Sequence, residues 1–200
     1  MALDYAARLR LPGDMTGAER KQAVSEELET LGLSERKDVR VGRLSGGQRK
    51  RVSIGVERLT RPGLFFLDEA TSGLDPGTEN RLMRLLRQLA DDGQTIVLIT
   101  HDLGIVAAVC DRVAVMYLGK IVEYADVQRV FHDALHPYTR GLLDSVPVFG
   151  RKGKRVLVPI KGIVPTPTEE IQGCAFEPRC PRAEAICKEQ TPPLEEIEPG

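Results

Sequence analysis

The chain has 200 residues, and its hydrophobic fraction of 42% is enough to bury a core. Its 28 Lys and Arg residues are balanced by 29 Asp and Glu residues, so the net charge of -1 gives no electrostatic reason to expect nucleic acid as a partner. The apolar stretches are too short to cross a bilayer, and the first residues do not resemble a signal peptide. We therefore expect a soluble, intracellular chain of one domain, or one domain with a small appendage.

Two helices are predicted at the start of the chain, within residues 1–33, and they are joined at Pro12 and Gly13. The second helix opens at Thr16, and Glu19 completes a capping-box pattern in which the two side chains satisfy free backbone N–H groups. A polar connection and a basic helix that ends near residue 59 follow. The first part of the chain is therefore predicted to be helical.

A short apolar strand is predicted next, at residues 64–67. Its uninterrupted apolar run suits a strand that is buried on both faces of a parallel sheet. A helix with a leucine stripe begins at Pro76, and a second buried strand is predicted at residues 95–99. This strand–helix–strand order predicts an α/β fold with a parallel-sheet core.

The second half of the chain changes character twice. A short helix, a hairpin of two strands and two more helices are predicted at residues 103–109, 112–117, 120–124, 126–132 and 137–146. From Pro147 onward prolines are frequent, helical periodicity disappears, and three of the four cysteines occur. We therefore predict a domain over residues 1–146 and an extended tail over residues 147–200.

Residues 44–48, Leu-Ser-Gly-Gly-Gln, have the composition of a phosphate-binding loop. Gly46 and Gly47 let backbone N–H groups approach an anion closely, and a helix that begins there adds partial positive charge. The hydroxyl of Ser45 is a further donor. Taken alone, the same residues could simply be a flexible turn before a helix.

Polar side chains follow both predicted strands. Asp68 and Glu69 come directly after the first strand, where open α/β sheets bind ligands, and His101 comes shortly after the second. An Asp at this place can hold Mg²⁺, a Glu can polarise an attacking water, and a His can donate to a terminal phosphate. A lone acidic pair is more often a solvated strand end, and a lone His usually has no catalytic role.

The order and spacing of these motifs favour the functional interpretation, because Asp68 lies 23 residues after Ser45 and His101 lies 33 residues after Asp68. The loop at 44–48 resembles the signature motif of ATP-binding cassette (ABC) transporter ATPases. Residues 64–69 are similar to the Walker B strand of that family, residues 72–75 to its D-loop, and residues 100–102 to its switch-histidine loop.

The resemblance implies a partial ABC ATPase domain of the P-loop NTPase type, with ATP and Mg²⁺ as cofactors. Asp68 would position Mg²⁺, Glu69 would activate water, and His101 would contact the γ-phosphate. The signature residues would bind a nucleotide held by the opposite subunit of a dimer, and the D-loop would couple the two sites. The residues concerned are Ser45, Gly46, Gly47, Gln48 and, in the D-loop, Asp75.

One element of the family is missing from the sequence. A P-loop reads Gly-x-x-x-x-Gly-Lys-Ser/Thr, and neither Gly-Lys pair, at Gly119 and Gly153, fits this pattern. The Gln-bearing loop that lies between the P-loop and the signature in the family is also missing. We therefore expect a fragment or truncated chain, which has no ATPase activity on its own.

The two halves resemble different branches of the family. Residues 43–87 resemble the exporter branch that includes pigment-precursor and sterol transporters. Residues 100–106, 111–117 and 136–140 resemble the oligopeptide, dipeptide and nickel importer ATPases, and so does the tail. Because exporters of that branch continue into membrane spans and none exists here, peptide-type import is favoured.

The tail cysteines resemble the C-terminal cysteine motif of the importer family. Cys174, Cys180 and Cys187 are separated by five and six residues, and in some members the motif holds an iron–sulfur cluster. Such clusters require four thiolates, and the fourth cysteine of the family would lie beyond Gly200. The cluster is thus a possible third cofactor. Cys110, in an apolar helix, is predicted to be a core residue.

These observations predict the ATP-hydrolysing subunit of an ABC transporter that energises peptide import, present as an incomplete piece. Its partners would be a second ABC ATPase subunit, in a homo- or heterodimer, and transmembrane permease subunits, without nucleic acid. It would lie on the cytoplasmic, inner face of the cell membrane. The alternatives are a degenerate half that lends its signature loop to a complete partner, and a fragment of an exporter-type ATPase.

Overall fold

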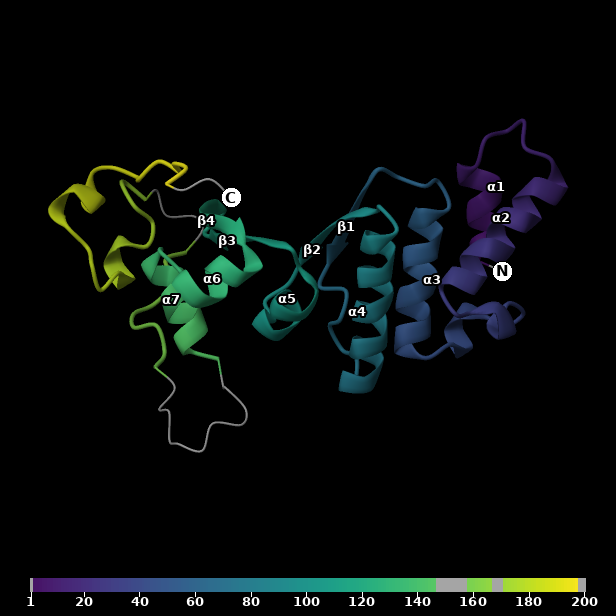
Figure 1. The fold of residues 1–200 in the computed structure, drawn as a ribbon, viewed down its shortest axis with the longest axis horizontal. Helices are drawn as coiled ribbons and strands as arrows, with labels where there is room; N and C mark the ends of the chain where they lie inside the picture. Colours follow the sequence, from purple (N-terminus) through teal and green to yellow (C-terminus); the bar gives the residue numbers. More distant parts are fainter. Residues whose placement is uncertain (1, 147–157, 167–170, 198–200) are drawn as a thin grey trace. The chain divides into compact units, whose positions relative to one another are not determined.

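The structure is a computed structural model that describes residues 2–146, 158–166 and 171–197 (Figure 1). The chain divides into two units, Met1–His101 and Asp102–Gly200, and each unit has its own two-stranded sheet. The boundary that we predict between residues 146 and 147 stays a prediction, because residues 147–157 lie outside the described part.

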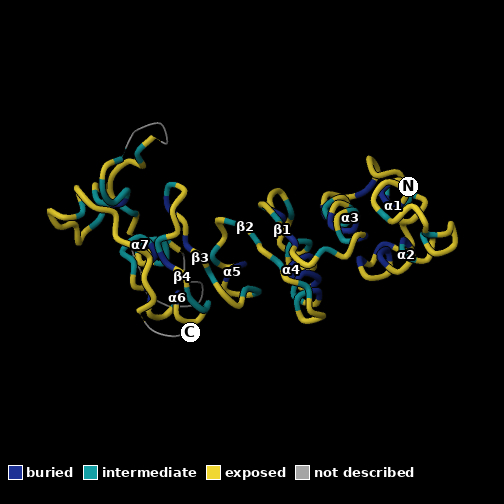
Figure 2. Tube along the Cα trace, turned by 90° about the horizontal axis from the view of Figure 1, so that it is seen from above, coloured by how far each residue is buried: buried dark blue, intermediate teal, exposed yellow. Residues whose placement is uncertain are grey.

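Three helices pack together at the start of the first unit (Figure 1). They are α1 (Ala2–Arg10), α2 (Gly17–Thr30) and α3 (Gly46–Arg58), and the short turns η1 (Ser34–Arg36) and η2 (Val41–Arg43) connect the last two. The capping box predicted at Thr16 and Glu19 is confirmed, since each side chain accepts a hydrogen bond from the other residue's amide. Buried apolar side chains hold the helices together: Leu3, Val24, Leu28, Leu31, Leu44 and Ile54. Figure 2 colours the chain by how far each residue is buried.

A strand–helix–strand segment completes the first unit, as predicted. Strands β1 (Leu64–Asp68) and β2 (Thr95–Ile99) are parallel and in register from Leu64 opposite Thr95 to Asp68 opposite Ile99. Helix α4 (Pro76–Asp91) connects them and packs against α3 and β2. Its apolar stripe is buried and consists of Leu82, Leu85, Leu86 and Leu89.

The prediction that these strands are buried on both faces is wrong for the described residues. Phe65 is 4% exposed, but its neighbour Phe66 is 63% exposed and points to the other face of the sheet. Val97 and Ile99 of β2 are exposed as well. An uninterrupted apolar run is compatible with two covered faces, but α4 can cover only one face of the pair.

The second unit is built around an antiparallel hairpin. The turn at Leu118 and Gly119 has positive φ at both residues, and it joins the strands where the sequence predicts. Cys110 ends the first helix of the unit and is half-buried, so it is not the core residue that we predict. The elements are α5 (Leu103–Val109), β3 (Arg112–Tyr117), β4 (Lys120–Asp126), α6 (Val127–Asp133), α7 (Pro137–Asp144), η3 (Glu177–Arg179) and η4 (Ala185–Lys188).

An aromatic cluster attaches the tail to the hairpin and α7. Phe176 of the tail is 2% exposed, and its ring centroid lies 5.2 Å from that of Tyr117 and 5.4 Å from that of Tyr138. The His136 ring is 5.7 Å away. Arg179 donates to the hydroxyl of Tyr117 at 3.4 Å. This part of the tail is therefore packed onto the second unit, although it contains only short 3-10 turns.

We expect His136 to make the second unit less stable in mild acid. Its Nδ1 atom accepts a hydrogen bond from the Tyr138 amide, and burial lowers the pKa of His136, although the nearby Glu123 carboxylate acts in the opposite direction. Between this lowered value and the ordinary pKa of about 6.5, the unfolded chain binds more protons than the folded unit. The free energy of unfolding should therefore fall as the pH drops below that ordinary value.

This prediction can be checked with His136→Asn, which cannot titrate but can still cap α7. Near-ultraviolet circular dichroism of tyrosine follows the second unit selectively, because Tyr117, Tyr124 and Tyr138 lie there and only Tyr5 lies in the first. The pH dependence of urea unfolding should be flatter in the variant. An unchanged dependence would contradict the assignment to His136.

Candidate functional site

The carboxyl ends of β1 and β2 bring two predicted site residues together. Glu69 directly follows β1, and His101 is the second residue after β2. Because Asp68 pairs with Ile99 in the parallel register, the two chain segments leave the sheet side by side. The Oε1 atom of Glu69 lies 2.9 Å from Nδ1 of His101. The Glu69 side chain is 37% exposed and that of His101 87% exposed, so both can reach a ligand from solvent.

The backbone of Glu69 has an unusual conformation that three neighbours hold. Its φ angle is 45°, in the left-handed region that residues other than glycine rarely adopt. Its amide donates to the carbonyl of Ile99 at 2.9 Å. Its own carbonyl accepts from the amide of Ser72 at 3.1 Å and from Nζ of Lys50 at 3.4 Å. The side chain of Glu69 is thus aimed at His101 by a backbone that is fixed on both sides.

The signature residues begin helix α3 with a second capping box. Ser45 is the N-cap, and its Oγ accepts from the amide of Gln48 at 3.3 Å, while Oε1 of Gln48 accepts from the amide of Ser45 at 3.0 Å. The amides of Gly46 and Gly47 lie in the first turn, where a helix has no internal acceptors for them. The hydroxyl proton of Ser45 and these two amides are therefore suited to binding an anion.

The signature residues pack against the start of α4. A Cβ atom on Gly47 would come within 2.1 Å of Cγ2 of Thr78, so a side chain has no room there. A Cβ on Gly46 would make an ordinary contact, 3.6 Å from Leu74. Asp75 caps α4 by accepting from the Thr78 amide at 3.0 Å, and hydrogen bonds from Thr78 keep the pKa of Asp75 below its ordinary value. The predicted signature and D-loop residues thus form one packed group.

Lys50 and Thr78 are the two contacting residues that sequence reasoning missed. Neither belongs to the motif residues selected above, and their contacts are made with residues that lie 19 and 31 positions away along the chain. The capping pattern of Ser45 and Gln48 was visible in the sequence as a Ser followed three residues later by Gln. By contrast, a lysine in a basic helix carries no local signal of its target.

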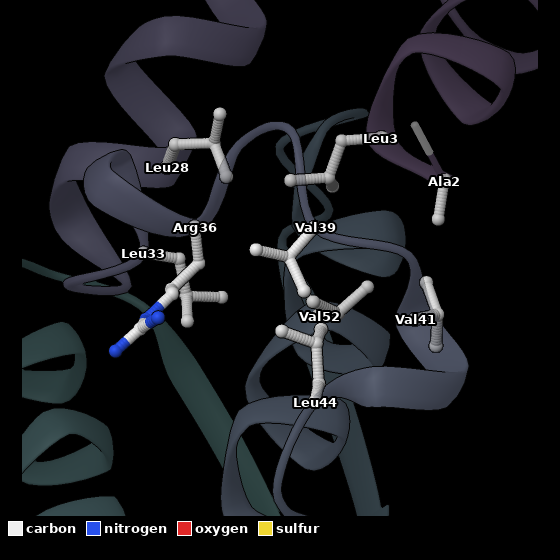
Figure 3. A pocket seen from close by; sticks show the side chains of 9 residues that line it. All are labelled: Ala2, Leu3, Leu28, Leu33, Arg36, Val39, Val41, Leu44 and Val52. Atoms are coloured by element: carbon white, nitrogen blue, oxygen red, sulfur yellow. The ribbon is translucent and has the colours of Figure 1, made fainter.

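An apolar pocket lies among the N-terminal helices, and Leu44, the first residue of the 44–48 loop, is part of its lining. Figure 3 shows its lining, which is aliphatic apart from Arg36. The residues that line it are Ala2, Leu3, Leu28, Leu33, Arg36, Val39, Val41, Leu44 and Val52. None of these is a predicted site residue, and the pocket offers few groups that could bind a phosphate.

The cysteines do not fit the cluster that the sequence suggests. In the described ranges no three or more His, Cys, Asp or Glu side chains are placed to hold a metal ion together. Cys174, Cys180 and Cys187 are free thiols of intermediate burial. The amide of Cys174 donates to the carbonyl of Cys187 at 2.8 Å, so a backbone hydrogen bond joins these two segments. The geometry gives the iron–sulfur hypothesis no support.

Two family models match the chain in different places. The model described as "ABC transporter" matches residues 4–72, and that described as "Oligopeptide/dipeptide transporter, C-terminal region" matches residues 122–187. The first match contains the predicted signature and Walker B residues, and the second runs from within β4 to Cys187 in the tail.

Similar proteins cover both halves of the chain. The oligopeptide transport ATP-binding protein OppD of Salmonella typhimurium is 45% identical over 157 residues, which are 78% of this chain and 46% of that protein. AppF of Bacillus subtilis, also named an oligopeptide transport ATP-binding protein, is 39% identical over 189 residues, 92% of this chain and 57% of that protein. The chain therefore spans about half the length of the curated relatives that it matches.

A solved structure has the same fold. It is cbiO1 from Clostridium perfringens, described as part of the ABC transporter complex cbiONQ. Its sequence is 32% identical to this chain. The match covers 66% of this chain and 53% of that one, and the TM-score is 0.61. The predicted fold class is thereby confirmed, with parallel strands and helices arranged as in part of that protein.

Proposed function

This chain belongs to the ATP-binding proteins of ABC transporters and carries an oligopeptide/dipeptide-type C-terminal region, and from this premise we propose that it is an ATP-hydrolysing part of a peptide importer. Peptide-transport relatives match residues in both halves of the chain, including the half whose motifs resemble exporters. This favours import over the exporter alternative for the chain as a whole.

The observation that carries the proposal is the contact between Glu69 and His101 at the end of the parallel strands. A carboxylate 2.9 Å from an imidazole, next to Asp68, is a suitable arrangement for hydrolysis of a terminal phosphate. Glu69 would polarise the attacking water as a general base, and His101 would hold the carboxylate and donate to the γ-phosphate. Both residues already lie at the same edge of the sheet, so no other element has to move to bring them together.

The family implies ATP and Mg²⁺, and the residues present fit part of their binding site. Asp68, at the end of β1, is exposed and offers the carboxylate oxygen that Mg²⁺ prefers. When bound, Mg²⁺ neutralises charge on the phosphates of the nucleotide. Ser45, Gly46 and Gly47 would donate to the γ-phosphate of a nucleotide on the opposite subunit. Gln48 would hold this loop in shape through the capping box, and Asp75 would do the same for the D-loop.

The proposed partners are a second ATP-binding subunit and transmembrane permease subunits. The described helices include none that is long and apolar enough to cross a membrane. We propose a peripheral place on the inner face of the membrane, reached through these partners, because the similar proteins are named as transport ATP-binding proteins. The tail from residue 147 would be the importer-type appendage to the ATP-binding part. No step of the proposed function involves an iron–sulfur cluster.

We expect the purified chain to release no phosphate from ATP and Mg²⁺ beyond the rate of its Glu69→Gln variant, because its 200 residues contain no P-loop pattern. Supplying the P-loop separately should restore turnover. A suitable source is a fragment of an ABC ATPase that contains the Gly-x-x-x-x-Gly-Lys-Ser/Thr pattern, coexpressed with the chain. In that assembly Glu69→Gln should lower the rate about 100-fold, as expected for loss of a general base.

Two outcomes would contradict this proposal. Turnover by the chain alone that disappears in Glu69→Gln would show that no separate P-loop is needed. If the assembled ATPase released phosphate at the same rate with Glu69→Gln, Glu69 would be excluded as the general base. The second candidate, a non-catalytic half-site, is favoured if the chain instead stimulates complete AppF, with an effect that depends on Ser45 but not on Glu69.

A further inference from the structure

We propose that Lys50 is a positioning residue that holds the backbone of Glu69 in its left-handed conformation. The inference rests on the proposed function, in which Glu69 is the general base. Lys50 belongs to α3, five residues after the helix N-cap Ser45. Its Nζ atom reaches the carbonyl oxygen of Glu69 at 3.4 Å. The helix that starts at the signature loop thereby contacts the residue that activates water.

The conformation of Glu69 explains why such a contact matters. A φ of 45° is unfavourable for a residue other than glycine, and it persists only where surrounding groups fix it. The Ile99 carbonyl fixes the amide of Glu69, and the Ser72 amide occupies one lone pair of its carbonyl. The ammonium of Lys50 occupies the other. The Lys50 contact, at 3.4 Å, thereby adds a charged donor to the 3.1 Å hydrogen bond from the Ser72 amide.

The direction of the Glu69 side chain follows from this backbone. The carboxylate meets Nδ1 of His101 at 2.9 Å only while the residue turns away from β1 as observed. If Lys50 releases the carbonyl, Glu69 can relax toward an ordinary backbone conformation, which carries the carboxylate away from His101. Lys50 does not touch the reacting atoms in this scheme. It acts through Glu69. Helix α3 would thus support two parts of the site, the signature loop at its start and Glu69 through Lys50.

Hydrogen exchange in the nucleotide-free chain tests the inference directly. The amide of Glu69 should exchange about tenfold faster in Lys50→Met, because the charged hydrogen bond that supports this turn is lost. The Leu86 amide, in the buried part of α4, should exchange at the wild-type rate. Lys50→Arg keeps N–H donors and a positive charge, and it should restore most of the protection at Glu69.

Arg49→Met is the matched control, since it removes the same charge from the exposed neighbouring position of the same helix. It should leave exchange at Glu69 unchanged. The inference is overturned if Lys50→Met does not alter the Glu69 amide, if it accelerates Leu86 equally, or if Arg49→Met has the same effect. Since no nucleotide is present, failure here is distinct from failure of the proposed function, which the turnover of the P-loop assembly measures.

Discussion

Replacing Gly47 by Ala should destabilise the first unit by about 1–3 kcal/mol, the range found when a methyl group is forced into a packed interior. The added Cβ would lie 2.1 Å from Cγ2 of Thr78, much closer than two carbon atoms can approach. Relief requires α3 to move away from α4 or Thr78 to change its rotamer. The first response displaces the amides of Gly46 and Gly47 that we propose bind phosphate, whereas the second leaves them in place and strains only Thr78.

The measurement is urea unfolding followed by far-ultraviolet circular dichroism, with exchange of the Leu86 amide as the report on the first unit. Gly46→Ala is the control, because its Cβ would make an ordinary contact with Leu74 at 3.6 Å. It should cost nothing measurable. The paired variant Gly47→Ala with Thr78→Ser removes the clashing methyl group and should recover most of the lost stability. Failure of that rescue would mean that the clash is not the cause.

The same packing illustrates why a motif position can require glycine for two separate reasons. Small size at position 47 allows a phosphate to approach the backbone, and this reason can be inferred from the sequence. Contact with Thr78 is the second reason, and it depends on how α3 and α4 cross, which no local pattern specifies. A Gly47 variant could therefore lose nucleotide binding for either reason. Only a loss that persists when Thr78→Ser removes the clash can be assigned to the phosphate contact.

Much of the first unit could be predicted because its elements have explicit boundary signals. Thr16 and Glu19 form the capping box that the sequence indicates, and Pro76 begins α4. The contact between Glu69 and His101 follows from one general rule, that carboxyl ends of parallel strands meet at one sheet edge. The sequence analysis places Glu69 and His101 at the ends of the two strands, and the contact between their side chains is a finding of the structure.

The features that could not be predicted depend on contacts between segments that lie far apart in the sequence. Phe66 is as apolar as Phe65, yet one is 63% exposed and the other 4%, because the sequence of a strand does not say what covers each face. Lys50 could not be linked to Glu69, since a flexible side chain on a basic helix can point in many directions. The shared metal that the spacing of Cys174, Cys180 and Cys187 suggests stays a prediction, because spacing alone does not bring three thiols together.

The second unit depends on one buried acid, and Glu123→Ala should cost about 3 kcal/mol of its stability, as expected when two hydrogen bonds to a charged acceptor are lost. Glu123 is 8% exposed. Its Oε1 accepts from the amide of Leu135 at 2.7 Å, and its Oε2 accepts from the amide of His136 at 3.1 Å. Truncation would leave both amides without their acceptor, at the point where the chain enters α7.

Graded variants distinguish this role from a general effect of charge. Glu123→Gln keeps one acceptor oxygen but presents an NH₂ group to the second amide, so about half of the cost should remain. Asp133→Ala removes an exposed acid from α6 of the same unit and should change little. Urea unfolding followed by near-ultraviolet circular dichroism is the appropriate measurement, because three of the four tyrosines lie in this unit.

The expected result is a ranking, with Asp133→Ala near wild type, Glu123→Gln intermediate and Glu123→Ala lowest. Equal costs for the two Glu123 variants would contradict this role, because the acceptor oxygen that Gln keeps would then contribute nothing. If Glu123→Ala were neutral, the entrance to α7 would have to be held by other contacts, such as the ring of Phe176 against Tyr138. In that case the tail would be needed to stabilise the second unit. The two hydrogen bonds of Glu123 favour the opposite order, in which the unit is stable first and the tail packs on it.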